Sequence, residues 1–291
     1  MTASGPPRVL GTSVGDVEVK DVGEGPAIVV MHGRGFGSGV DGYAWLRAEL
    51  PNFRIISIAR PGYGQTPLET ARTFEEQGRL IDAVLLALDV DRAIALGVSN
   101  GGPAAIWAAA LFPERVAGLV LWCAVATPVV PRHELSEVEA AMADDVLKVA
   151  YDQEMLFVAA AAELEEFNEH AALAIMSQTE VDRVKAEPLV IESLRDYLRS
   201  RLSAPPGLEG MRNDAIQNQL DGQKQPPNLA VPALIMHGDQ DSTVPLAHAK
   251  FNAERGEDVE LVILEGGSHG FFHGFRIETV VALREFANKV L

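Results

Sequence analysis

The segment that decides the fold reads Ala93-Ile-Ala-Leu-Gly-Val-Ser-Asn-Gly101 and continues through an alanine-rich run to Leu111. Its first six residues are apolar and have the length of a buried strand. The alanine-rich run has the composition of a helix, and Pro113 stops it. The segment therefore predicts a strand, a tight turn at Ser99 and a helix, which together make one βα unit of a parallel sheet.

Further apolar runs of strand length lie on both sides of this unit. Their recurrence predicts an α/β fold with a mostly parallel central sheet of about eight strands flanked by helices. We expect strands at about 9–12, 17–22, 27–31, 54–58, 92–98, 116–123, 231–237 and 259–264, the first two forming an antiparallel hairpin. We expect helices at about 43–50, 100–111, 245–253 and 277–290. Another helix should begin after Thr73, which has the character of an N-cap.

The pattern changes between about Thr127 and Pro227, where no β-rich run occurs and Ala, Glu, Leu and Arg dominate. Helical patterns cover 134–170, 171–185 and 189–202, and Pro205-Pro206-Gly207 ends the series. We predict a helical cap at 127–225, inserted into a core made of 1–126 and 226–291. Four apolar cap residues suggest an apolar acyl or ring portion in the substrate, although they could equally pack the cap onto itself: Met155, Leu156, Phe157 and Phe167.

Composition excludes some classes of partner. The 291 residues are 47% hydrophobic and carry a formal net charge of -17 at pH 7. Such an acidic chain should repel phosphate backbones and anionic lipid surfaces, so we expect no nucleic-acid or membrane partner. We expect a small-molecule substrate, and a homodimer is a possible assembly.

The first thirteen residues contain neither a basic segment nor the apolar segment that follows it in a signal peptide, so we expect no signal peptide. No stretch approaches the roughly 18 apolar residues of a membrane-spanning helix. We therefore expect a cytoplasmic protein. The one cysteine, Cys123, lies in the apolar run 118–124, which predicts a buried, unreactive thiol and no intrachain disulfide.

The sequence Gly97-Val98-Ser99-Asn100-Gly101 matches the pattern G-x-S-x-G in the strand-turn-helix context that a nucleophilic serine requires. The glycines allow a turn tight enough to hold the serine hydroxyl exposed in a strained conformation. We predict Ser99 as the nucleophile, with the backbone N–H of Asn100 as one donor of an oxyanion hole. The alternative is a structural turn with a capping serine.

A serine hydroxyl needs a base to take its proton, and the base needs an orienting acid. The sequences His-Gly-Asp-Gln-Asp and Gly-Gly-Ser-His-Gly each follow a later strand and give the order Ser, Asp, His. We predict His269 as the base, with His273 as the fallback. Asp239 and Asp241 both qualify as the acid by position.

Five motifs in this order resemble the α/β-hydrolase superfamily: 32–35, 60–64, 97–120, 237–245 and 266–269. The resemblance implies that the acid is the fifth residue of H-G-x-x-D-x-x-V-P, which is Asp241. It also implies that the second oxyanion N–H belongs to Arg34, whose side chain either grips a substrate carboxylate or extends into water. In that family the strand before P-G-Y-G often ends in an acid that braces the turn, and Ala59 stands in that region here.

These residues favour hydrolysis of a small carboxylic ester, thioester or lactone through an acyl-enzyme on Ser99. Relatives with the same triad include C–C bond hydrolases, aminopeptidases and cofactor-free perhydrolases, and the fold also serves non-hydrolytic synthases and ligand-binding receptors. His133, His170 and His248 show no metal-ligand grouping, and no P-loop or dinucleotide fingerprint occurs. We therefore expect neither a metal nor a cofactor. The sequence names no substrate-binding residue.

Overall fold

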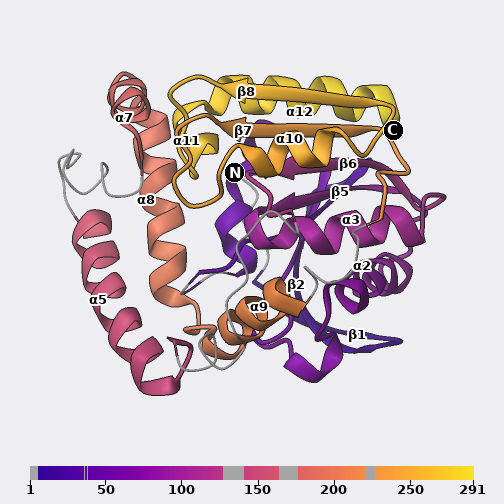
Figure 1. The fold of residues 1–291 in the computed structure, drawn as a ribbon, viewed down its shortest axis with the longest axis horizontal. Coiled ribbons are helices and arrows are strands. Elements are labelled where there is room, and N and C mark those ends of the chain that lie inside the picture. Colours follow the sequence, from indigo (N-terminus) through magenta and orange to yellow (C-terminus); the bar gives the residue numbers. More distant parts are fainter. Residues whose placement is uncertain (1–5, 36, 38, 127–140, 164–175, 221–226) are drawn as a thin grey trace.

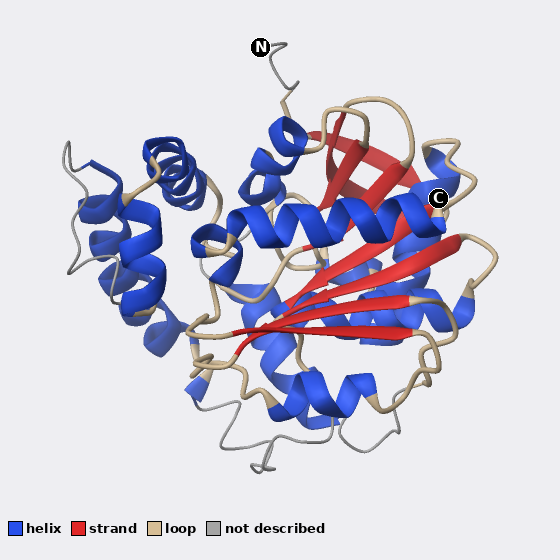
Figure 2. Ribbon diagram, turned by 90° about the horizontal axis from the view of Figure 1, so that it is seen from above, coloured by secondary structure: helices blue, strands red, loops and turns tan. Residues whose placement is uncertain are grey.

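A computed structural model describes residues 6–35, 37, 39–126, 141–163, 176–220 and 227–291. Eight strands form one sheet in the order β1-β2-β4-β3-β5-β6-β7-β8 (Figures 1 and 2). β1 and β2 are antiparallel to their neighbours, and the six strands β3 to β8 are parallel to each other. The mostly parallel sheet predicted from the sequence is confirmed. The strands are β1 (Arg8–Thr12), β2 (Gly15–Val22), β3 (Ala27–Met31), β4 (Arg54–Ile58), β5 (Ala93–Val98), β6 (Val116–Trp122), β7 (Ala233–Gly238) and β8 (Val259–Leu264).

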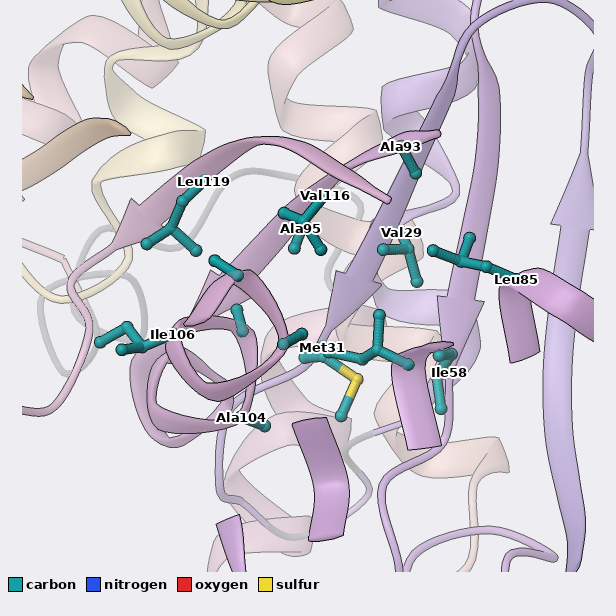
Figure 3. Packing of buried hydrophobic residues seen from close by; sticks show 14 of the residues in the cluster. Val29, Met31, Ile58, Leu85, Ala93, Ala95, Ala104, Ile106, Val116 and Leu119 are labelled. Carbon is teal, nitrogen blue, oxygen red and sulfur yellow. The ribbon is translucent and has the colours of Figure 1, made fainter. Parts of the chain in front are cut away.

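Helices cover both faces of the sheet, because successive residues of its buried strands point to opposite sides. Val29 and Met31 belong to one apolar cluster, whereas Ile28 and Val30 belong to the other. Figure 3 shows the first cluster, in which side chains of β3 and β5 face those of α3. The helices of the first face are α2 (Phe74–Ala87), α3 (Gly102–Leu111) and α10 (Ala247–Ala253), and those of the second are α1 (Trp45–Glu49), α11 (Phe271–Gly274) and α12 (Arg276–Val290). The described residues also form three short 3-10 helices, η1 (Val40–Tyr43), η2 (Leu68–Thr70) and η3 (Ser99–Gly101).

Four described helices lie between β6 and β7. They are α5 (Asp144–Glu163), α7 (Gln178–Lys185), α8 (Pro188–Ser203) and α9 (Leu208–Leu220). α5, α7 and α8 bury a third apolar cluster of their own, and Figure 1 draws them together on the left of the molecule. Residues 127–140, 164–175 and 221–226 lie outside the described part, so the division of the chain into a core and a cap at 127–225 stays a prediction. None of the described helices is long and apolar enough to cross a membrane.

The helix α9 contradicts the expectation that Pro205-Pro206-Gly207 ends the helical series. Its most buried side chains are largely polar, among them Asn213, Asp214 and Gln217, so the apolar periodicity that marks a helix is missing. The N-cap at Thr73 is confirmed, because its hydroxyl accepts a hydrogen bond from the Glu76 N–H. The helix expected at 43–50 is divided into η1 and α1. The helical patterns 134–170 and 171–185 correspond to α5 and α7 where the structure describes them.

Candidate active site

Ser99 stands at the turn between β5 and α3, at the carboxyl edge of the sheet. Its φ of 50° lies in the left-handed region, which is strained for a residue with a side chain. Gly101 permits this turn, because a Cβ there would overlap the carbonyl oxygen of Met31 on the neighbouring strand. The turn thus holds a buried hydroxyl in a fixed, strained position beyond the strand end.

His269 lies in the loop after β8 and its Nε2 is 3.1 Å from the hydroxyl oxygen of Ser99. Its other ring nitrogen, Nδ1, is 2.7 Å from Oδ2 of Asp241, which follows β7. The second carboxylate oxygen of Asp241 accepts hydrogen bonds from the N–H groups of Thr243 and Val244, both at 2.8 Å. The carboxylate is therefore held by its own turn while it faces the imidazole.

The geometry also separates the predicted residues from their alternatives. Asp239 accepts a hydrogen bond from the Gly266 N–H at 2.7 Å, so it ties the loop after β7 to the loop that carries His269. His273 is buried in α11, and neither of its ring nitrogens has a hydrogen-bond partner among the described residues. The structure brings Ser99, Asp241 and His269 together and leaves Asp239 and His273 out of this chain of hydrogen bonds.

Opposing effects set the charges of His269 and Asp241. Burial lowers the pKa of the His269 imidazole, but Cys123 and the Asp241 carboxylate outweigh burial, and the net shift is upward from 6.5. Burial raises the pKa of Asp241, but its hydrogen bond to His269 and the charge of that ring bring the net pKa below 3.8. Each group thus stabilises the charged form of the other, which suits an imidazole that must accept a proton.

Cys123 lies at the same edge of the sheet, directly after β6. Its expected burial is confirmed, and its Sγ, a His269 nitrogen and an Asp241 carboxylate oxygen all lie within 4.8 Å of one another. Its φ of 41° is in the left-handed region, like that of Ser99. The apolar run 118–124 predicts an ordinary core cysteine, and the proximity of Cys123 to His269 was missed. The available signal was its position after a parallel strand, because the carboxyl ends of such strands share one edge.

The two predicted oxyanion donors flank Ser99 from different segments. Asn100 follows Ser99 in η3, and Gly33 lies so close that a Cβ there would be 3.0 Å from the Ser99 Cβ. Arg34, the next residue, is exposed. Its backbone is thus near the serine, while its side chain has access to solvent. The assignment of both N–H groups as oxyanion donors stays a prediction.

The imidazole of His32 fixes the loop that contains Gly33. Its Nδ1 lies 2.8 Å from the Gly33 carbonyl oxygen, and its Nε2 lies 3.0 Å from the Arg60 N–H. Burial and the neighbouring Arg60 charge lower the pKa of His32 to about 3, so the ring is neutral. A neutral ring fits both contacts, with Nδ1 donating to the carbonyl and Nε2 accepting from the backbone N–H.

A buried ion pair joins α9 to the turn beside Ser99. The Arg60 guanidinium contacts both carboxylate oxygens of Asp214, and it also donates to the carbonyl oxygen of Asn100 at 2.9 Å. The Tyr63 hydroxyl donates to Asp214 at 2.8 Å. From the same helix, Asn218 donates to the side chain of Asn100 at 3.1 Å. Sequence reasoning missed this support, because neither Arg60 nor Asp214 indicates its partner by spacing.

The turn after β4 has an acidic brace although Ala59, which follows the strand, carries no acid. The carboxylate of Glu18, on the adjacent strand β2, accepts a hydrogen bond from the Gln65 N–H at 2.5 Å. A Cβ on Gly64 would overlap this carboxylate and would lie 3.2 Å from the Ala59 Cβ. Glu18 therefore supplies from another strand the acid that Ala59 lacks.

A sequence profile described as the alpha/beta hydrolase fold matches residues 26–274. The chain belongs to this family. It is 27% identical over 261 residues to the uncharacterized hydrolase YcgS of Bacillus subtilis (strain 168), with 88% of each chain covered. It is also 27% identical over 276 residues to the pimeloyl-[acyl-carrier protein] methyl ester esterase of Xanthomonas oryzae pv. oryzae (strain MAFF 311018), covering 92% of this chain and 98% of the esterase.

A solved structure extends the likeness to three dimensions. The alpha/beta hydrolase fold protein from Nakamurella multipartita has a TM-score of 0.72 and 27% identity, with 98% of this chain and 99% of the other covered. The family membership and these relatives show an enzyme of the ester-hydrolase type. They leave the substrate open.

Proposed function

We propose that this α/β-hydrolase cleaves small carboxylic esters, thioesters or lactones through an acyl-enzyme on Ser99. The Ser99 hydroxyl attacks the carbonyl carbon while His269 takes its proton, and the N–H groups of Arg34 and Asn100 bind the developing oxyanion. The C–O or C–S bond to the leaving group then breaks, and His269 donates the proton to the departing oxygen or sulfur, which leaves as an alcohol or thiol or, for a lactone, stays attached as a hydroxyl. Water, deprotonated by the same imidazole, attacks the acyl carbon and releases the acid and free Ser99.

One observation carries this proposal: the unbroken chain of contacts from the Ser99 hydroxyl through His269 to Asp241, at 3.1 and 2.7 Å. The strained φ of Ser99 supports it, because the strain holds the hydroxyl in place for attack. The esterase from Xanthomonas supports the choice of an ester as substrate. The homodimer and the cytoplasmic location stay predictions from the sequence.

Replacing Ser99 with alanine tests the proposal. We expect the Ser99→Ala variant to fold and to lose at least about 1,000-fold in kcat/KM on p-nitrophenyl esters, since it lacks the hydroxyl that faces His269. A fluorophosphonate probe should label the wild type and not the variant. A folded Ser99→Ala variant with undiminished ester turnover would overturn the proposal. A panel of acyl chain lengths, lactones and dienolates would then define the bond and the substrate class.

A further inference from the structure

An acidic side chain from the helices between β6 and β7 reaches the loop 265–270 between β8 and α11, called here the His269 loop. Glu180, on α7, is completely buried, which is unusual for a carboxylate and requires compensating contacts. Its Oε2 accepts a hydrogen bond from the N–H of Ser268 at 3.0 Å. Ser268 directly precedes His269, so this bond holds the backbone next to the imidazole that faces Ser99.

A second contact joins the same helix start to the same loop. Oε2 of Glu180 also accepts the Ser177 N–H at 2.8 Å and so completes the capping box of α7. The Ser177 hydroxyl donates in turn to the carbonyl oxygen of Gly266. The N-terminus of α7 therefore binds the His269 loop at two backbone points, one on each side of Gly267.

The packing around Glu180 leaves its carboxylate little freedom. A Cβ on Gly274, in α11, would lie 2.5 Å from the Glu180 Cγ, so the side chain fits closely against the helix that follows His269. Arg183, one turn further along α7, donates to the Gly274 carbonyl at 2.8 Å and lies over the Phe275 ring. α7 thus contacts the chain both before and after His269.

We propose that Glu180 is a positioning residue, which holds the backbone of Ser268 so that His269 stays within reach of both Ser99 and Asp241. Glu180 acts on the reaction only through the placement of the imidazole. The inference rests on the proposed function, because it assigns Glu180 a role through the predicted base.

Two variants of nearly equal shape separate the hydrogen bond from packing. Glu180→Gln keeps an oxygen that can accept the Ser268 N–H, whereas Glu180→Met fills a similar volume without a comparable acceptor. With p-nitrophenyl acetate as the probe, we expect Glu180→Met to lower kcat by about 10- to 100-fold and to change KM by less than about threefold. Glu180→Gln should retain kcat within about threefold of the wild type. The matched control is Asp182→Ala, which removes an exposed acid from the same helix and should behave as the wild type.

A double-mutant cycle decides whether the effect passes through His269. In a His269→Ala background, Glu180→Met should cause no further loss of the residual rate. If Glu180→Met does not fold, Ser177→Ala replaces it, since this variant removes the second contact to the loop and leaves Glu180 in place. We then expect a similar loss in kcat with KM nearly unchanged.

Three results would overturn the inference: a kcat of folded Glu180→Met equal to that of the wild type, an equal loss in Glu180→Gln, or an additive loss in the His269→Ala background. The failure of the proposed function has a different signature. In that case Ser99→Ala itself retains ester turnover, whatever the Glu180 variants do.

Discussion

At the scale of single residues, the proposed mechanism makes the charge on His269 set the pH dependence of the reaction. The imidazole must be neutral to take the proton of Ser99, and its pKa is raised above 6.5 mainly by its neighbours Cys123 and Asp241 acting against burial. As pH falls through this raised pKa, the ring becomes protonated and kcat/KM decreases. We therefore expect the acid limb of the kcat/KM profile on a p-nitrophenyl ester to have an apparent pKa above 6.5.

The variant Asp241→Asn tests the cause of that shift. Its side-chain oxygen can still accept from Thr243 and Val244, but the carboxylate charge next to the ring is gone. We expect kcat to fall by about 1,000- to 10,000-fold and the acid limb to move to lower pH. An acid limb at the same pH in Asp241→Asn and wild type would show that the carboxylate does not set the pKa of His269.

At the scale of elements, α9 is attached to the site by a buried ion pair. The side chains of Arg60 and Asp214 are 0% and 2% exposed. Burial lowers the pKa of Arg60, but Asp214 and Tyr63 raise it by a larger amount. The net shift is upward, so the guanidinium remains charged. Removing one partner of such a pair leaves a buried charge without compensation.

We expect Asp214→Ala to lower the free energy of unfolding by about 3–5 kcal/mol, as measured in urea. The double variant Arg60→Met with Asp214→Leu removes both charges and fills a similar volume, so it should recover much of this loss. It should still show a reduced kcat, because the Arg60 contact to the Asn100 carbonyl at the serine turn is lost. A double variant less stable than Asp214→Ala would contradict this account.

The same elements show what a sequence can reveal. The turn at Ser99 and the positions of the strands along the chain were predictable, because each depends on a local pattern of apolar residues and glycines. The places of Asp241 and His269 after later strands suggested that they approach Ser99, but the choice of Asp241 over Asp239 came from the family resemblance. The helix α9 was not, since its inward face is polar. The contacts of Glu180 with Ser268 and of Cys123 with His269 also lay beyond sequence reasoning, because packing between distant segments creates them and no spacing marks them.

At the scale of the whole molecule, buried histidines link stability to pH. Burial, with Arg60, lowers the pKa of His32 to about 3, and burial, with Arg276, does the same for His273. Both rings titrate near 6.5 in the unfolded chain. Below pH 6.5 the unfolded state therefore binds more protons at these sites, and stability is lost as pH falls from 6.5 towards 3. The pKa of His269 is raised, so its contribution to stability changes with pH in the opposite direction. The pH dependence of total stability alone therefore does not isolate the effect of His32 and His273.

The variant His273→Phe isolates one of these groups. His273 lies among Trp45, Tyr197 and Phe272, and neither ring nitrogen has a partner among the described residues, so a phenyl ring suits the site. At pH 7 we expect a gain of about 1–3 kcal/mol in the free energy of unfolding, because an unsatisfied buried polar group is removed. At pH 5 the gain should be larger by about 2 kcal/mol, since the unfolded variant no longer binds the proton that the wild type binds there. Urea unfolding of both proteins at the two pH values measures the difference in their free energies of unfolding. The contributions of His32 and His269 are the same in both proteins and cancel in this difference. An equal gain at pH 7 and pH 5 would mean that His273 keeps a near-normal pKa in the folded protein and that its burial does not drive acid unfolding.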